Sequence, residues 1–302
     1  MKKNLKRDVR VLKKIISLIY IILILTISIS ILGAEGKKFN RIASLTLSGD
    51  EMILRLVDHG RIVGLCGQIN EEPDMSHVEE EAKKFPKIES NIETMIELEP
   101  DLVITADWMK KEILLQIQET GANVYTYKTP KNFKEQKELI KELAVLVGEE
   151  EKGEEIVKNM ETRLSILQKQ IHDGYKGEKL RILLYTSYEN TSGKGTTFDD
   201  MVSLIGGINA ASEAEIIGSQ KISKEKVIEL NPDVIIIPIW KGHINSEGFS
   251  EFVMNDPSYE DVKAVKNKRI YLLKYKDISP TSQYMIEGIE NLGKAIYNLK
   301  EE

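Results

Sequence analysis

The chain contains one stretch of 18 residues twice, and this internal duplication restricts the folds open to it. The first copy runs from Asn91 to Trp108 (NIETMIELEPDLVITADW), and the second runs from Ser223 to Trp240 (SKEKVIELNPDVIIIPIW), 132 positions later. Eight of the 18 positions are identical. A period this long is not that of a solenoid, so the duplication predicts two similar α/β lobes of ordinary domain size with a cleft between them.

Each copy has the pattern of a short helix that leads directly into a buried strand. Asn91 and Ser223 are good N-cap residues, because their side-chain oxygens can accept from the free N–H groups of a first turn. Pro100 and Pro232 end the helix, since the residue before a proline is disfavoured in the α region. The apolar run that follows is typical of a central strand in a parallel sheet that helices cover on both faces.

Between the lobes lies a charged stretch without proline, residues 132–171, whose leucines and other apolar residues recur at spacings of three and four. That is helical periodicity, and Gly148 and Gly153 are predicted to divide it into two helices, the second running from lobe to lobe. The expected boundaries are a signal peptide at 1–34, an N-terminal lobe at 37–129, a helical linker at 130–175 and a C-terminal lobe at 176–302.

Composition argues for a globular protein and against a nucleic-acid binder. Hydrophobic residues make up 41% of the 302 and charged residues 30%, which is ordinary for a folded domain. After the first 34 residues the chain holds 35 basic against 47 acidic side chains, so no basic face for nucleic acid is expected. Cys66 is the only cysteine; it cannot form an internal disulfide and is expected to be a small buried residue.

The first 34 residues have the pattern of an export signal. They contain seven basic residues and one acid, Asp8, and the run from Ile15 to Leu32 is apolar and uncharged. Cleavage is expected after Ala34, although 18 apolar residues barely suffice to cross a bilayer and an uncleaved membrane anchor stays open. No cysteine directly follows the apolar run, so the sequence predicts a soluble periplasmic protein that is not a lipoprotein.

The best candidates for ligand contact are aromatic residues that follow predicted strands. In open α/β sheets, ligands bind beyond the carboxyl ends of the strands, where Trp108 and Trp240 stand with polar neighbours. Two aromatic rings from opposite lobes suit a large, flat or ring-shaped ligand. The alternative, in which each tryptophan fills the core of its own lobe, stays open. By the same rule the second lobe adds further candidates: Tyr185, Tyr188, His243, Tyr275 and Lys276.

Glu93 and Glu225 are the acidic residues that the two copies share near their helix starts. The helix dipole alone favours an acid in a first turn. Two carboxylates at equivalent places, one on each lobe, would also form a docking surface for a basic partner.

Other chemistries find little support. The segment 192–197 (SGKGTT) lacks the earlier glycine and the Lys-Ser/Thr step of a phosphate-binding loop. The four histidines show no metal-ligand spacing, and no nucleophile motif is evident, so neither a metal site nor an enzyme is predicted. An exported α/β enzyme stays an alternative.

Four segments together resemble the substrate-binding proteins of ABC importers for iron-siderophore, haem and cobalamin. They are RIASLTLSGDEMILRLVDHGRIVGL, NIETMIELEPDLVI, TSGKGTTFDDMVSLIGGINAAS and ISKEKVIELNPDVIII, and the resemblance extends from Phe39 to Leu299. It implies an α/β fold of two Rossmann-like lobes with parallel sheets, joined by a single long helix, with the ligand in the cleft and little hinge motion. It also implies that Glu93 and Glu225 dock onto arginines of the membrane permease.

The chain departs from that family at two positions. Leu47 stands where many relatives have proline, and Thr281 stands where many have an arginine that contacts ferric siderophores. The resemblance nevertheless predicts a monomeric, non-enzymatic protein without a cofactor of its own. It would capture an iron chelate (a siderophore or haem) or cobalamin and deliver it to the permease. Haem would need an axial ligand such as Tyr188, Tyr275 or His243.

Two further alternatives remain besides an exported enzyme. One is a transition-metal-ion binder of the same architecture, with His77 and His243 among its ligands. The other is an exported sensor domain tethered to the membrane by its uncleaved N-terminus.

Overall fold

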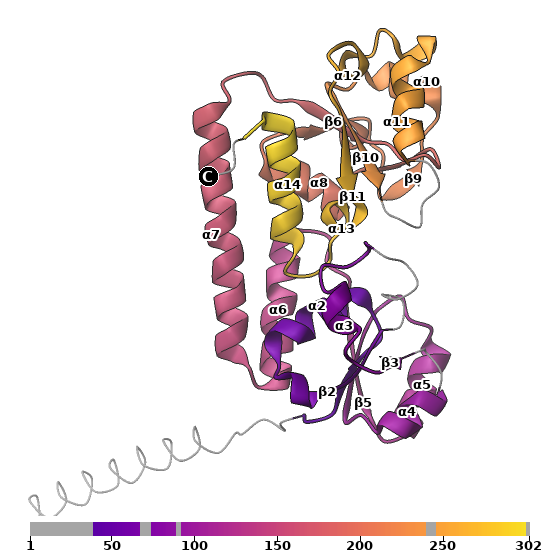
Figure 1. The fold of residues 1–302 in the computed structure, drawn as a ribbon, viewed down its shortest axis with the longest axis vertical. Helices are drawn as coiled ribbons and strands as arrows, with labels where there is room; N and C mark the ends of the chain where they lie inside the picture. Colours follow the sequence, from indigo (N-terminus) through magenta and orange to yellow (C-terminus); the bar gives the residue numbers. More distant parts are fainter. Residues whose placement is uncertain (1–38, 67–73, 89–91, 240–245, 300–302) are drawn as a thin grey trace, which may run out of the picture. The chain divides into compact units, whose positions relative to one another are not determined.

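The computed structural model describes residues 39–66, 74–88, 92–239 and 246–299, and these residues form one compact unit. Two parallel sheets with helices packed around them form this unit (Figure 1). None of the helices in these described ranges is both long and apolar enough to cross a membrane. The predicted signal and its cleavage point lie outside the described residues.

The N-terminal lobe is built on a five-stranded parallel sheet with the strand order β3-β2-β1-β4-β5. The strands are β1 (Ile42–Ser44), β2 (Ile62–Cys66), β3 (Lys87–Ile88), β4 (Leu102–Ala106) and β5 (Asn123–Tyr127). The helices are α2 (Leu47–Leu56), α3 (Glu79–Ala82), α4 (Ile92–Leu98) and α5 (Lys111–Glu119), with a 3₁₀ turn, η1 (His59–Arg61). Every residue of β4 is buried, as its two-sided apolar pattern predicts.

The C-terminal lobe has a four-stranded parallel sheet in the order β11-β10-β6-β8. Its strands are β6 (Arg181–Leu184), β8 (Ile208–Asn209), β10 (Val234–Ile239) and β11 (Ile270–Lys274); β7 (Asn190–Ser192) and β9 (Ser219–Lys221) form a small antiparallel pair. Its helices are α8 (Thr197–Leu204), α9 (Ala210–Glu213), α10 (Lys224–Leu230), α11 (Ser246–Asn255), α12 (Lys263–Lys266), α13 (Tyr275–Ile278) and α14 (Met285–Tyr297), with a 3₁₀ turn, η3 (Pro257–Tyr259).

Two helices connect the lobes: α6 (Phe133–Val147) and the long helix α7 (Glu150–Gly174). Gly148 ends α6 in a left-handed conformation, as predicted. The prediction that Gly153 also breaks the stretch is wrong, because Gly153 lies inside α7. A side chain there would collide with Ala144 of α6, so this glycine lets the two helices approach closely.

The two copies of the repeat form the same arrangement in both lobes. The carboxylate of Asp101 accepts from the backbone N–H groups of Asn40 and Arg41 just before β1, and that of Asp233 accepts from the N–H of Arg181 at the start of β6. The guanidinium of Arg41 donates to the last carbonyls of α4, and that of Arg181 donates to the last carbonyls of α10. The duplication therefore encodes a clamp between a helix end and the starts of two strands.

A continuous apolar core extends through both lobes along the connecting helices. It includes Met52 of α2, Leu143 of α6, Met160 of α7, Phe198 of α8 and Ile289 of α14, each at most 1% exposed. Figure 1 shows α14 lying between α7 and the C-terminal sheet. A shared core of this kind resists movement of one lobe relative to the other.

Candidate ligand-binding cleft

Two adjoining pockets open where the strands end. The first, of about 210 Å³, has walls from both lobes: Thr46, Leu47, Ser48, Glu51, Met75, Trp108 and Thr129 from one, and Tyr275, Lys276, Ser279, Pro280 and Thr281 from the other. The second, also about 210 Å³, lies in the C-terminal lobe and includes Leu184, Thr186, Tyr188, Asn190, Thr191, Ser192, Ser219 and Pro238. Because both pockets share Tyr275 and Ser279, we treat them as one cleft.

The turn from β1 to α2 forms the hydroxyl-rich part of the N-terminal wall. Thr46 caps α2 by accepting from the backbone N–H of Gly49 at 3.0 Å. Any side chain at Gly49 would collide with the Thr46 and Ser44 hydroxyls. The hydroxyl of Tyr127 lies 2.7 Å from the hydroxyls of Thr46 and Ser48. Burial raises the pKa of Tyr127, so its hydroxyl stays protonated. This network fixes the wall hydroxyls before any ligand arrives.

The loop that carries Trp108 is hydrogen-bonded to the loop after β5. The carboxylate of Asp107 accepts from both the N–H and the hydroxyl of Thr129, at 3.2 and 2.8 Å, which joins the loops after β4 and β5. Trp108 itself is 60% exposed and lines the first pocket, so it is not a core residue. Its contact with a ligand stays a prediction.

The C-terminal wall carries three of the candidates. Tyr188 is 62% exposed and lines the second pocket. Tyr275, at the start of α13, is half-buried and lines both pockets. Lys276 lines the first pocket, and its Nζ lies 3.4 Å from the backbone carbonyl of Ser76 in the other lobe.

The expectation that Tyr185 stands on the cleft rim is wrong, because this residue is 1% exposed. Its hydroxyl lies 3.1 Å from that of Tyr259, and its ring packs edge-on against Phe249. Side chains alternate along a strand, so Tyr185 shares the face of Leu183, while Leu184 between them faces the second pocket. The other two candidates, Trp240 and His243, lie outside the described residues.

Several cleft residues were missed because the sequence analysis favoured aromatic rings. Thr46 follows β1 and Thr129 follows β5, so the strand-end rule that selected Trp108 would also have selected them. Ser279 follows a helix instead of a strand, and no local pattern indicates its position in the cleft.

The described residues contain no group of three or more histidines, cysteines or acids that could hold a metal ion. His77, a candidate ligand in the metal-ion alternative, is engaged between the lobes. Its imidazole nitrogens lie 3.3 Å from Asp277 and 3.2 Å from Glu287, and its ring stacks on Tyr284 at 4.5 Å.

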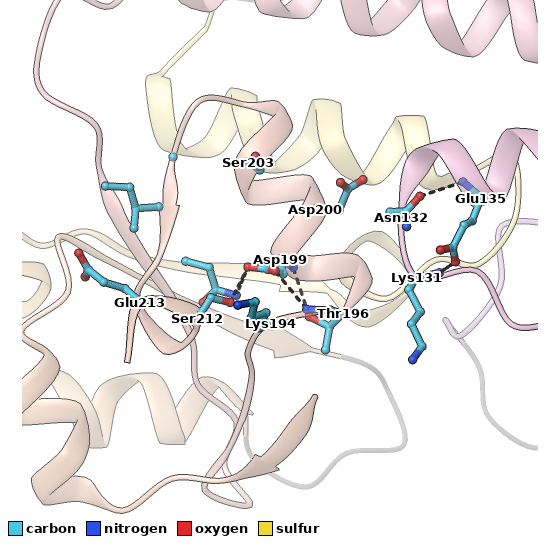
Figure 2. A pocket seen from close by; sticks show the side chains of 14 residues that line it. Lys131, Asn132, Glu135, Lys194, Thr196, Asp199, Asp200, Ser203, Ser212 and Glu213 are labelled. Atoms are coloured by element: carbon cyan, nitrogen blue, oxygen red, sulfur yellow. Dashed lines mark hydrogen bonds between the residues drawn. The ribbon is translucent and has the colours of Figure 1, made fainter. Parts of the chain in front are cut away.

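A larger groove of about 690 Å³ lies between the start of α6 and the helices α8 and α9 (Figure 2). Its acids already have partners inside the protein. Asp199 accepts from Ser212 and Asn209, and Asp200 accepts from the backbone N–H of Phe133 at 2.7 Å. Glu213 is ion-paired with Arg181 at 2.7 Å. These bonds support the local fold, and none of the predicted ligand residues that the structure describes lines this groove.

The SGKGTT segment borders the same groove, where it serves as a helix cap. Thr196 accepts from the backbone N–H of Asp199 and so begins α8. This role accounts for the segment without a bound phosphate, as its incomplete motif indicates.

Glu93 and Glu225 are both exposed, in the first turns of α4 and α10. Figure 1 shows α4 and α10 on the side of the two sheets away from α7. The pKa of Glu225 is lowered by a backbone hydrogen bond at its own position and by the Ser223 side chain, so its carboxylate is charged at neutral pH. Their role in docking stays a prediction.

A family model described as periplasmic binding protein matches residues 42–276. The chain belongs to this family. A Bacillus subtilis protein named as an uncharacterized ABC transporter substrate-binding lipoprotein, YvrC, is 26% identical over 268 residues, which cover 86% of this chain and 81% of its own. The iron-uptake system-binding protein of the same organism is 25% identical over 205 residues, 65% of this chain and 61% of its own.

Among solved structures, a possible iron-binding periplasmic solute-binding protein of Staphylococcus epidermidis has a TM-score of 0.73 to this chain at 25% identity. The match covers 86% of this chain and 100% of that protein. The predicted fold class, two α/β lobes with parallel sheets and a connecting long helix, is thereby confirmed.

One prediction about location is wrong by these comparisons. The YvrC relative is named a lipoprotein, which contradicts the expectation that this protein is not one. That expectation rested only on the absence of a cysteine directly after the apolar run. A location outside the cytoplasm agrees with both the family and the relative.

Proposed function

We propose that this periplasmic binding protein is the substrate-binding component of an ABC importer that captures an iron chelate or a corrinoid. The observation that carries the proposal is a cleft at the strand ends of a confirmed binding-protein fold, with an exposed tryptophan in its wall. Both named relatives support a transport role, and one of them serves iron uptake.

The cleft wall favours a ligand with a large, weakly charged face. Trp108, Tyr188 and Tyr275 offer aromatic surface, and the surrounding hydroxyls can bind polar edges of a chelate. Among the described residues that line the two pockets, Lys276 is the one cation and Glu51 the one carboxylate. A wall so close to neutral disfavours a chelate that carries several negative charges.

Both departures from the family pattern lie in this wall. Leu47 and Thr281 line the first pocket, at the positions where many relatives have proline and arginine. Without that arginine, a strongly anionic ferric siderophore lacks one positively charged contact in this wall. Haem, a corrinoid or a neutral chelate therefore fits the wall better.

Delivery to the permease is proposed to use Glu93 and Glu225. One exposed carboxylate on each lobe gives two-point contact with arginines of the permease, and complementary charge of this kind fixes orientation. A two-point contact would also report whether the lobes stand at the correct separation.

Ligand-induced stabilisation tests the proposed function. The melting temperature of the purified protein is measured with haemin, cobalamin, a ferric hydroxamate, a ferric catecholate and free metal ions. One chelate should raise it progressively with concentration, because a ligand that binds only the folded state stabilises that state by mass action. Stabilisation by a free metal ion alone would contradict the proposal and favour a metal-ion binder.

A further inference from the structure

Glu51 is a buried carboxylate that connects three separate segments of the chain. It lies in α2 and is 6% exposed. Its Oε1 accepts from the Ser76 hydroxyl at 2.7 Å and from the His77 backbone N–H at 2.9 Å, and its Oε2 accepts from the hydroxyl of Ser282. Its backbone carbonyl accepts from the side-chain amide of Gln283 at 2.7 Å. The group is thus fully hydrogen-bonded on both sides of the boundary between the lobes.

A second set of polar contacts crosses the same boundary beside Glu51. His77 of the N-terminal lobe lies between Asp277 and Glu287 of the C-terminal lobe and stacks on Tyr284. The guanidinium of Arg55, one turn after Glu51 in α2, donates to the Tyr284 hydroxyl at 2.9 Å. The direct polar contacts on this side of the cleft therefore centre on α2 and residues 276–287.

These contacts lie directly behind the cleft wall. Glu51 itself lines the first pocket, as do Met75, which precedes Ser76, and Thr281, which precedes Ser282. Any change in the separation of the lobes at Glu51 must therefore move both walls of the pocket.

We propose that Glu51 is a positioning residue that holds the two lobes at a fixed separation and thereby sets the width of the cleft. The Glu51 carboxylate accepts three hydrogen bonds, and separating it from the three donors is costly. Each donor would lose its hydrogen-bond partner at a site where water does not replace it. The consequence for ligand affinity rests on the proposed function, whereas the lobe separation itself is measurable without any ligand.

The chemistry of substitution gives a graded test. In Glu51→Gln, the amide oxygen can still accept from Ser76 and His77, and the amide nitrogen can donate to the Ser282 hydroxyl. In Glu51→Ala all three side-chain bonds are lost. Ser282→Ala removes only the side-chain bond that Glu51 makes across the boundary, so it serves as a second and milder variant.

Asp50 provides a matched control. It precedes Glu51 and is fully buried, but its carboxylate accepts from the Cys66 backbone N–H at 3.0 and 3.2 Å, within the N-terminal lobe. Asp50→Ala should lower the melting temperature without altering the lobe separation. The control therefore distinguishes a general loss of stability from a loss of positioning.

The experiment measures the distance between spin labels on Glu119→Cys of α5 and Glu251→Cys of α11, in a Cys66→Ala background without ligand. Both label sites are exposed, one on each lobe. We expect one narrow distance distribution for the parent, for Glu51→Gln and for Asp50→Ala, and a broadened distribution for Glu51→Ala and, to a smaller extent, for Ser282→Ala. A narrow, parent-like distribution in Glu51→Ala would overturn the proposal. Should Glu51→Ala fail to fold, a parent-like distribution in Ser282→Ala would do so.

With haemin as the probe, affinity should fall about tenfold in Glu51→Ala, which corresponds to about 1.4 kcal/mol, and much less in Glu51→Gln. If haemin does not bind the parent protein, the proposed function loses one ligand class while the distance measurement still decides the role of Glu51. An unchanged haemin affinity in Glu51→Ala, together with a broadened distance, would overturn the predicted consequence for ligand affinity while supporting the role of Glu51 in lobe separation.

Discussion

The two lobes share a duplicated framework but present different surfaces to the cleft. In both lobes, the aspartate after the repeated proline accepts hydrogen bonds from backbone N–H groups at the start of the neighbouring strand. The arginine at that strand start donates to the last carbonyls of the repeated helix. The tyrosine that follows β6, Tyr185, is a core residue, whereas the equivalent end of β1 leads into the hydroxyl-rich turn at Thr46 and Ser48. Duplication thus preserved the bonds that form each lobe, and the ligand surface was built separately on each.

Substitution of the two repeated aspartates should have the largest effect on the free energy of unfolding. Asp101→Ala should reduce the free energy of unfolding by about 2–3 kcal/mol, because it removes two charge-assisted bonds to backbone N–H groups. Asp233→Ala removes one such bond and a surface ion pair with Lys263, so about 1–2 kcal/mol is expected. Chemical denaturation measures both.

Asp261→Ala is the control for these two variants, because this carboxylate is largely exposed and pairs only with Lys266 at the surface. Its effect should stay within about 0.5 kcal/mol. An effect of Asp101→Ala no larger than this would show that the shared clamp does not stabilise the lobes.

The sequence predicted the framework well because the framework is local. The strands expected after Pro100 and Pro232 are β4 (Leu102–Ala106) and β10 (Val234–Ile239), and the proline-terminated helices before them are α4 and α10. Trp108 was expected to be solvent-facing, and it is.

The failures concern how the helices and strands pack against one another. The role of Gly153 depends on Ala144 of a neighbouring helix, and burial of Tyr185 depends on which face of β6 it occupies. The bond between Glu51 and Ser282 joins residues 231 positions apart, which no local pattern can indicate. Site geometry set by packing between lobes is therefore the part that a single sequence does not reveal.

Substitution of the two exposed glutamates should have a smaller effect, and it should reduce transport without changing ligand binding. Glu93→Ala combined with Glu225→Ala should reduce importer-dependent uptake by about tenfold or more, since both of the proposed charge contacts with the permease are lost. Ligand affinity should be unchanged, because neither residue lines the cleft. Uptake into cells and binding to the purified protein measure the two quantities. A loss of ligand affinity in the double variant would contradict the docking role.

Substitution of the residue before each repeated proline should have the smallest effect on stability. Glu99 and Asn231 both have positive φ, 40° and 46°, and asparagine tolerates this left-handed region better than glutamate does. Glu99→Asn should therefore stabilise the protein by about 0.5–1 kcal/mol. Asn231→Glu should destabilise it by at least as much, because it also removes the hydrogen bond that the Asn231 side-chain oxygen accepts from the backbone N–H of Lys263. Thermal unfolding of the two reciprocal variants tests this, and a destabilising Glu99→Asn would show that the two helix ends are not equivalent.

The central claim is that a chelate binds in the cleft beside Trp108. Tryptophan fluorescence tests this claim most directly. The parent protein, Trp108→Phe and Trp240→Phe are titrated with the chelate that raises the melting temperature most. We predict saturable quenching in the parent, loss of the part that Trp108 contributes in Trp108→Phe, and retention of that part in Trp240→Phe. Affinity in Trp108→Phe should fall by no more than about tenfold. Undiminished quenching in Trp108→Phe, with unchanged affinity, would place the ligand elsewhere and contradict the account.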